Sequence, residues 1–123
     1  IHLNGHPQKR LPNNVNITIL DIEGEALLLL LDQYGIAAAT GSACDSQTLE
    51  PSHVILALGL PYEAAHGSLR LTLGRQNSEA DVDEVLQRLP EIVTKLRQAS
   101  PVRVSVEDVL KVVAKKKQYV ATN

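Results

Sequence analysis

Cys44, the single cysteine of the chain, lies in a stretch of small and polar residues, GSACDS at 41–46. A structural cysteine usually packs as a small hydrophobe inside an apolar run, whereas Cys44 is flanked by Ser42 and Asp45. These neighbours favour a thiol that solvent can reach, and an exposed thiol that ionises is a nucleophile. The thiolate can attack carbon, or it can attack sulfur and become a persulfide. An unreactive loop cysteine fits this local context equally well.

Arg70 is the second side chain whose type and place suit chemistry. In the segment SLRLTL at 68–73, leucines alternate with polar residues, and this alternation predicts a strand with the leucines on the core face and Arg70 on the opposite face. An arginine in the middle of such a strand can bind a carboxylate through two parallel hydrogen bonds. The alternative is a solvated arginine on the open face of a sheet.

The four histidines give weaker signals. His2 and His6 are four residues apart, but the segment around them contains glycine and proline and is not helical in pattern. With one cysteine far away in sequence, this argues against a zinc site. His53 and His66 each leave open a Cys/His nucleophile pair, although most histidines are structural or lie on the surface. The chain has no glycine-rich loop with a lysine for phosphate binding.

The composition limits the function classes. The chain has 123 residues, enough for one domain, and a core of Leu, Ile, Val and Ala, since it has three tyrosines and no phenylalanine or tryptophan. The net charge of -2 gives no indication of a nucleic-acid partner. A lone cysteine, no apolar run long enough to span a membrane and no signal-peptide pattern predict a cytoplasmic protein without a membrane partner. The start at Ile1 is compatible with a fragment.

The elements that must position Cys44 and Arg70 follow from periodicity. We expect strands at 15–19, 36–40 and 68–73 and helices at 26–34, 51–58, 61–65 and 82–96, after an irregular segment 1–13. A capping box of Ser78 and Asp81 opens the long helix, and Pro90 inside it predicts a kink or break near Leu89. A last helix is expected from Ser105. This order predicts an α/β (α+β) fold in which a small three-stranded sheet packs against helices.

Several motifs occur in collinear order along residues 3–101: RLPNNVN at 10–16, IEGEALL at 22–28, GSAC at 41–44, LEPSHV at 49–54 and AHGSLRLTLGR at 65–75. Together they resemble the C-terminal part of NifS-like cysteine desulfurases, members of the class V aminotransferase fold family. The resemblance implies that residues 1–101 form the C-terminal small domain of a fold-type I pyridoxal phosphate (PLP) enzyme, with residues 102–123 as a helical extension. It places Cys44 on the family's catalytic cysteine, which takes sulfur from L-cysteine as a persulfide and releases L-alanine. It places Arg70 on the arginine that binds the substrate carboxylate.

One part of the family pattern is missing. The family's large domain holds PLP with a Schiff-base lysine, a stacking histidine and an aspartate, and none of the lysines here (Lys9, Lys95, Lys111, Lys115, Lys116 and Lys117) matches that lysine. The resemblance therefore implies that this chain binds no cofactor, is inactive alone, and works with a PLP-binding large domain in a homodimeric enzyme. It also implies a sulfur acceptor or scaffold protein for iron-sulfur cluster or thio-cofactor assembly.

Two alternatives remain at this point. A standalone sulfur-relay module would accept sulfur at Cys44 from another protein without a cofactor. A relative with different chemistry, such as a selenocysteine lyase or an aminotransferase, would share the fold; the Ser-Ala-Cys loop disfavours the aminotransferase, which needs no nucleophilic cysteine.

Overall fold

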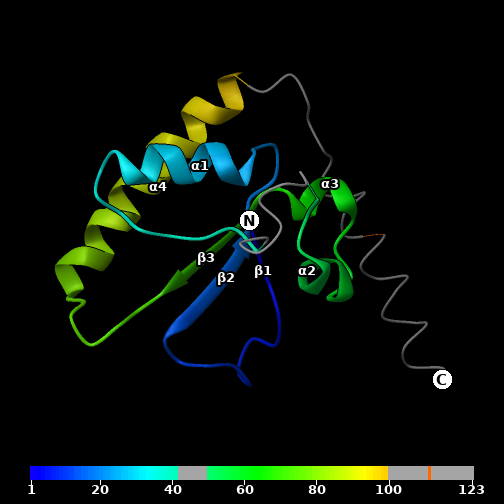
Figure 1. Ribbon diagram of the computed structural model, residues 1–123, viewed down its shortest axis with the longest axis horizontal. Coiled ribbons are helices and arrows are strands. Elements are labelled where there is room, and N and C mark those ends of the chain that lie inside the picture. Colours follow the sequence, from blue (N-terminus) through cyan, green and yellow to red (C-terminus); the bar gives the residue numbers. More distant parts are fainter. Residues whose placement is uncertain (42–49, 100–110, 112–123) are drawn as a thin grey trace.

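A computed structural model describes residues 1–41, 50–99 and 111 of the chain. Its elements are three strands and four helices in the described ranges: β1 (His2–Leu3), β2 (Asn14–Thr18), α1 (Gly24–Asp32), α2 (His53–Ala57), α3 (Tyr62–Ala65), β3 (Ser68–Thr72) and α4 (Glu79–Ala99). Figure 1 shows α1 and α4 side by side along the sheet, whereas α2 and α3 lie together beyond the end at which β3 begins. The expected architecture, a small three-stranded sheet packed against helices, is confirmed.

The sheet is antiparallel throughout, with the strand order β1-β2-β3. The central strand β2 alternates polar and apolar residues, so one face of the sheet is polar and the other apolar. Ile17 and Ile19 from this segment, with Leu69 opposite Ile17 on β3, enter the main core. The alternation in 15–19 and 68–73 therefore predicted both long strands and their faces, although Leu73, just beyond the end of β3, is 48% exposed.

Helices α1 and α4 cover the apolar face. The leucine run of α1 has strong helix propensity, and it buries Leu27 and Leu31 against Ile92 and Val93 of α4. Gly35 ends α1 as expected: its φ is +71°, and the N–H of the next residue donates to the Leu31 carbonyl at 3.1 Å. Packing on this face holds the sheet and both helices as one unit.

The capping box predicted for α4 is present. The Ser78 N–H donates to Asp81 Oδ2 at 2.8 Å, and the Asp81 N–H donates to Ser78 Oγ at 3.4 Å. Of the kink or break predicted near Leu89, the break is wrong, because α4 continues through Pro90 as one helix. The kink stays a prediction. Packing of Ile92 and its neighbours against α1 offsets the hydrogen bond that proline cannot donate.

The predicted strand at 36–40 is also wrong, since only Ala39 pairs there, in a single bridge to Arg70. The irregular segment expected at 1–13 contains a strand instead, β1, whose partner on β2 lies far along the chain. Strand pairing depends on the partner more than on the strand's own residues. In addition, β1 has only two residues, which is too short for an alternating pattern to be recognised. The helix expected from Ser105 lies outside the described residues.

A second, smaller core holds α2 and α3. It consists of Leu20, Ile55, Leu60, Ala64 and Ala65. Both helices have the bounds expected within two residues. Since α3 leads directly into β3, this cluster fixes α2 against the end of the sheet where Ser68 lies. No helix in the described ranges is long and apolar enough to cross a membrane.

Candidate functional site

Arg70 lies in the middle of a row of residues that crosses the polar face of the sheet. Its N–H donates to the Ala39 carbonyl at 2.6 Å and its carbonyl accepts from the Ala39 N–H at 3.1 Å. On the other side, the register places Asn16 opposite Arg70, and the Asn16 carbonyl accepts from the Asn4 N–H at 2.9 Å. The backbones of Asn16 and Arg70 therefore bond away from each other. In antiparallel sheets such non-hydrogen-bonded pairs bring their side chains closest together.

The polar face around Arg70 carries no carboxylate at its strand positions. These positions hold His2, Asn14, Asn16, Thr18, Ser68 and Thr72 besides Arg70 itself. Arg70 is exposed, and its guanidinium forms no ion pair within the part of the chain that the structure describes. A guanidinium with five N–H donors and no carboxylate beside it is a ready site for an external carboxylate. The expectation that Arg70 faces away from the core is confirmed, and its role stays a prediction.

The chain enters the cysteine segment beside this face. After Ala39 pairs with Arg70, the Gly41 N–H donates to Ser68 Oγ at 3.3 Å. Ser68 is 3% exposed, although the alternation of its strand placed it on the open face. Gly41 lies against Ser68 at that end of the sheet and contributes to its burial. Residue 41 is thus anchored two positions along β3 from Arg70.

The far end of the same segment returns to the same place. A Cβ built on Gly41 would lie 2.7 Å from Ser52 Cβ and 3.2 Å from Ile55 Cγ1, so the backbone of residue 41 packs closely against the start of α2. Ser52 and Ile55 are 7% and 3% exposed. The two ends that flank residues 42–49 are therefore in contact, and only a residue without a side chain fits at position 41.

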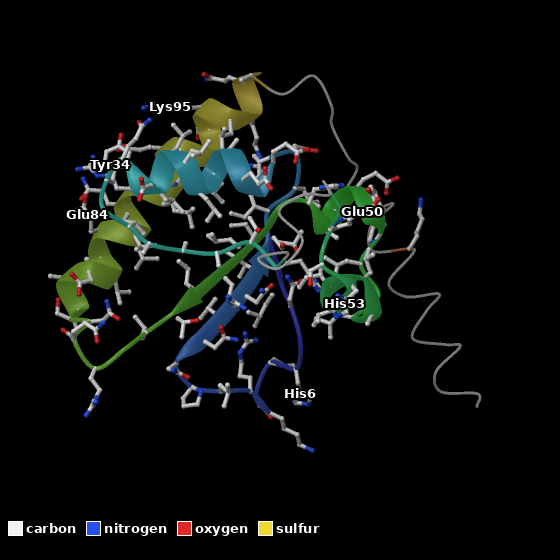
Figure 2. The ribbon with its side chains drawn as sticks, viewed as in Figure 1. His6, Tyr34, Glu50, His53, Glu84 and Lys95 are labelled. Carbon is white, nitrogen blue, oxygen red and sulfur yellow. The ribbon has the colours of Figure 1, made fainter. Side chains whose placement is uncertain are left out.

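Tyr62 of α3 secures the residue just after this segment. Partial desolvation and, next, the Glu50 carboxylate, to which the phenol is hydrogen bonded, raise the pKa of Tyr62 above its ordinary value of 10.0. Figure 2 shows Glu50 and His53 on the α2–α3 side of the molecule. Glu50 is thereby held next to the point where residue 52 meets Gly41.

Cys44 itself lies outside the described residues. Of the two histidines considered as its partners, His53 is exposed at the start of α2, and His66 is half-buried with its ring edge-on to Tyr62 and 4.0 Å from Glu23 Oε2. Among the described residues, these contacts place the His66 ring beside Tyr62 and Glu23. Within the described ranges, no three metal-ligating side chains come together.

The described residues do not fit a PLP site. A Schiff-base lysine needs an enclosed environment, and Lys9, Lys95 and Lys111 are all exposed. Lys95 lies on α4, on the far side of the molecule from Glu50 and His53 (Figure 2). No step of PLP chemistry can therefore be assigned to these residues.

Sequence reasoning missed three contributors to the site: Asn4, Asn16 and the contact of Gly41 with Ser52. The alternation of polar and apolar residues along 14–18 places Asn16 on the polar face. The sequence could not predict that Asn16 pairs with Arg70, because the two residues are far apart in the chain. Nothing in the local sequence distinguishes Asn16 from Asn14.

Comparison with known proteins gives a consistent picture. Residues 1–85 match the family described as Aminotransferase class-V. The chain is 65% identical over 100 residues to cysteine desulfurase IscS of Methanosarcina thermophila and 59% identical over 100 residues to cysteine desulfurase IscS 1 of Archaeoglobus fulgidus. Each match covers 81% of this chain but only 25% and 26% of the relatives, so the chain spans about a quarter of their length.

Two solved structures share the fold. A NifS-like protein superimposes with a TM-score of 0.64 at 30% identity, over 77% of this chain and 23% of that protein. The NifS-like protein from Rickettsia africae gives a TM-score of 0.58 at 28% identity, over 71% of this chain and 21% of that protein. The small sheet with its helices is thus a recurrent unit within larger proteins of this kind.

Proposed function

The chain belongs to the aminotransferase class-V family, and we propose that it is the C-terminal, sulfur-accepting domain of a PLP-dependent cysteine desulfurase. The identity of 65% to a cysteine desulfurase supports this assignment. We place PLP on a large domain outside this sequence, because the described lysines are exposed and unsuited to hold it. On this proposal the chain alone is inactive. Residues 1–101 form the domain, and 102–123 remain a predicted extension.

The proposed reaction uses two side chains of this chain. Arg70 binds the carboxylate of L-cysteine, and the Cys44 thiolate attacks the substrate sulfur. A sulfur–sulfur bond forms while the carbon–sulfur bond of the substrate breaks; the electron pair stays on that carbon, which takes a proton to give L-alanine. Bound PLP supplies the electron sink for such steps. Cys44 is left as a persulfide. An acceptor protein then receives its terminal sulfur for iron-sulfur cluster or thio-cofactor assembly.

The guanidinium of Arg70 makes no ion pair with any residue that the structure describes, and it lies beside the anchored ends of the cysteine segment. This observation carries the proposal. Cys44 is three residues beyond Gly41, so chain length alone keeps its Cα within about 11 Å of the Gly41 Cα. Gly41 is bonded to Ser68, two positions from Arg70 on β3. We propose that the segment presents the Cys44 thiol to a substrate whose carboxylate Arg70 binds.

The test is the intact mass of the chain after incubation with PLP and L-cysteine, with and without the large domain. We expect a gain of one sulfur atom only with the large domain present, and none in Cys44→Ser, which should retain PLP absorbance in the assembled enzyme. Sulfur gain by the isolated chain with PLP would refute the placement of the cofactor. Sulfur gain from a persulfide donor without PLP would favour the relay module, and turnover of L-selenocysteine alone would favour the lyase.

Arg70→Ala provides the second test. It should raise the KM for L-cysteine about 10- to 100-fold, the scale of a lost charge-assisted hydrogen bond. Arg75→Ala is the matched control, because Arg75 is an exposed arginine just beyond the end of β3. Equal KM values for Arg70→Ala and the wild-type enzyme would show that the carboxylate binds elsewhere.

A further inference from the structure

We infer that Asn16 is a second carboxylate-binding residue, donating through Nδ2 to the substrate carboxylate that Arg70 holds, and that Asn4 positions it. The inference rests on the proposed function and extends it to the specificity of the same site. It begins from the register, which places Asn16 and Arg70 directly opposite each other on the polar face. Because the pair is non-hydrogen-bonded, these two side chains are as close as neighbouring strands allow.

The amide of Asn16 is oriented by a buried neighbour. Asn4 is 3% exposed, and its Nδ2 donates to Asn16 Oδ1 at 2.6 Å and to Thr18 Oγ1 at 2.9 Å. The two hydrogens of that Nδ2 group are then both used, and Asn16 Oδ1 is committed as an acceptor on the β1 side. This arrangement leaves Nδ2 as the group of Asn16 that can serve a ligand.

Asn4 is itself held firmly. Arg10 donates to the Asn4 carbonyl and to the Asn14 carbonyl, each at 3.3 Å, and so ties β1 to the start of β2. Thr18, which is fully buried, shares two hydrogen-bond contacts with the Asn4 side chain. A buried amide with fixed partners has one orientation, so the Asn16 amide inherits that orientation.

The Nδ2 donor of Asn16 can bind a carboxylate lone pair that Arg70 does not use. Asn16 Nδ2 forms no hydrogen bond to any of the residues that the structure describes. A carboxylate has about four lone-pair sites, and a guanidinium bound side-on occupies two of them. An amide donor on the neighbouring strand can take a third. Asn16 and Arg70 together thus form a carboxylate cradle that a single arginine on an open sheet would lack.

Asn14 provides an internal comparison on the same strand and face. It lies opposite Thr72 instead of an arginine, and its Oδ1 accepts from Thr72 Oγ1 at 3.3 Å. The same substitution at Asn14 and Asn16 changes the charge equally but touches the cradle only at Asn16. Asp in place of Asn retains the acceptor oxygen at both sites and replaces the donor by a second oxygen.

The experiment measures KM and kcat for L-cysteine with the full-length enzyme. Asn16→Asp should raise KM about 10- to 100-fold, the scale of a hydrogen bond to a charged group, with kcat changed much less. Asn14→Asp should change KM by at most about fivefold, the scale of a surface charge interaction. Thermal unfolding of both variants should match the wild type. Asn16→Ala, which adds no charge, should also raise KM and gives a second measurement if Asn16→Asp misfolds.

Cysteamine, which lacks the carboxylate, is the specific probe: the ratio of variant to wild-type kcat/KM should stay near one for cysteamine and fall for L-cysteine. Equal KM changes at Asn14 and Asn16, or equal losses with both substrates, would overturn the cradle while leaving the proposed function intact. A full-length wild-type enzyme without desulfurase activity would overturn the proposed function and the cradle with it.

Discussion

Gly41→Ala tests whether the contact between the ends of the cysteine segment matters. The new Cβ would lie 2.7 Å from Ser52 Cβ and 3.2 Å from Ile55 Cγ1. Carbon atoms pack at about 3.5–4.0 Å, so the two ends must separate by about 1 Å. Ser52 and Ile55 are buried, so neither can yield by turning into solvent.

Overpacking of this kind costs about 1–3 kcal/mol. For a chain of this size that corresponds to a fall in Tm of roughly 3–15 °C. The functional cost is separate: a displacement of about 1 Å in a reacting group can lower the rate on the order of 100-fold. We therefore expect slower sulfur loading of Cys44 in the assembled enzyme, measured by intact mass over time, together with the lower Tm.

Ser52→Gly is the compensating substitution. It removes the two atoms of Ser52 nearest the new Cβ. Ser52 is the N-cap of α2 but makes no side-chain capping bond, so glycine there should cost only a few tenths of a kcal/mol. The double variant should recover at least about 1 kcal/mol of the free energy of unfolding and most of the loading rate.

A double-mutant cycle decides the matter. If the effects of Gly41→Ala and Ser52→Gly add within about 0.5 kcal/mol, the two residues are energetically independent. The contact would then have no part in holding the segment. Recovery of Tm without recovery of the loading rate would show that the contact of Gly41 with Ser52 affects stability but not sulfur loading.

Three further predictions concern the frame around the site. Gly67→Ala should prevent folding or cost more than about 3 kcal/mol in chemical denaturation, because its Cβ would lie 2.0 Å from the Ile19 carbonyl oxygen; a stable variant would contradict this. Pro90→Ala should raise Tm, since Pro90 is exposed and its replacement restores a helical hydrogen bond worth up to about 3 kcal/mol; an unchanged Tm would show that α4 has already relaxed around it. The N–H of Ser78 lowers the pKa of Asp81 below its ordinary value of 3.8, so its charge stabilises the fold above that value and the benefit is lost as pH falls through the lowered pKa. Asp81→Asn should accordingly reduce Tm at pH 7, and the difference in Tm from the wild type should shrink as the pH falls through the lowered pKa of Asp81. A reduction of Tm that does not change with pH would show that the Asp81 charge is not its cause.

Local patterns predicted most of the frame. Alternation identified β2 and β3 and placed Arg70 on the polar face, and helical spacing with the Ser78–Asp81 box identified α4. These features succeed because their hydrogen bonds or faces involve residues close in the chain. The break at Pro90 and the strand at 36–40 were predicted wrongly for the opposite reason. Core packing carries α4 through the proline, and among the described residues only Ala39 of 36–40 pairs with a strand.

The sequence by itself determined the family motifs and, through the resemblance they carry, the candidate roles of Cys44 and Arg70. The tertiary structure alone decided which side chains surround Arg70. The row from Asn4 through Asn16 to Arg70 and Ala39 joins four separate segments. The contact of Gly41 with Ser52 brings together two further residues that are not neighbours in the sequence. Such contacts are set by strand register and close packing between distant residues, and neither leaves a periodic trace along the chain.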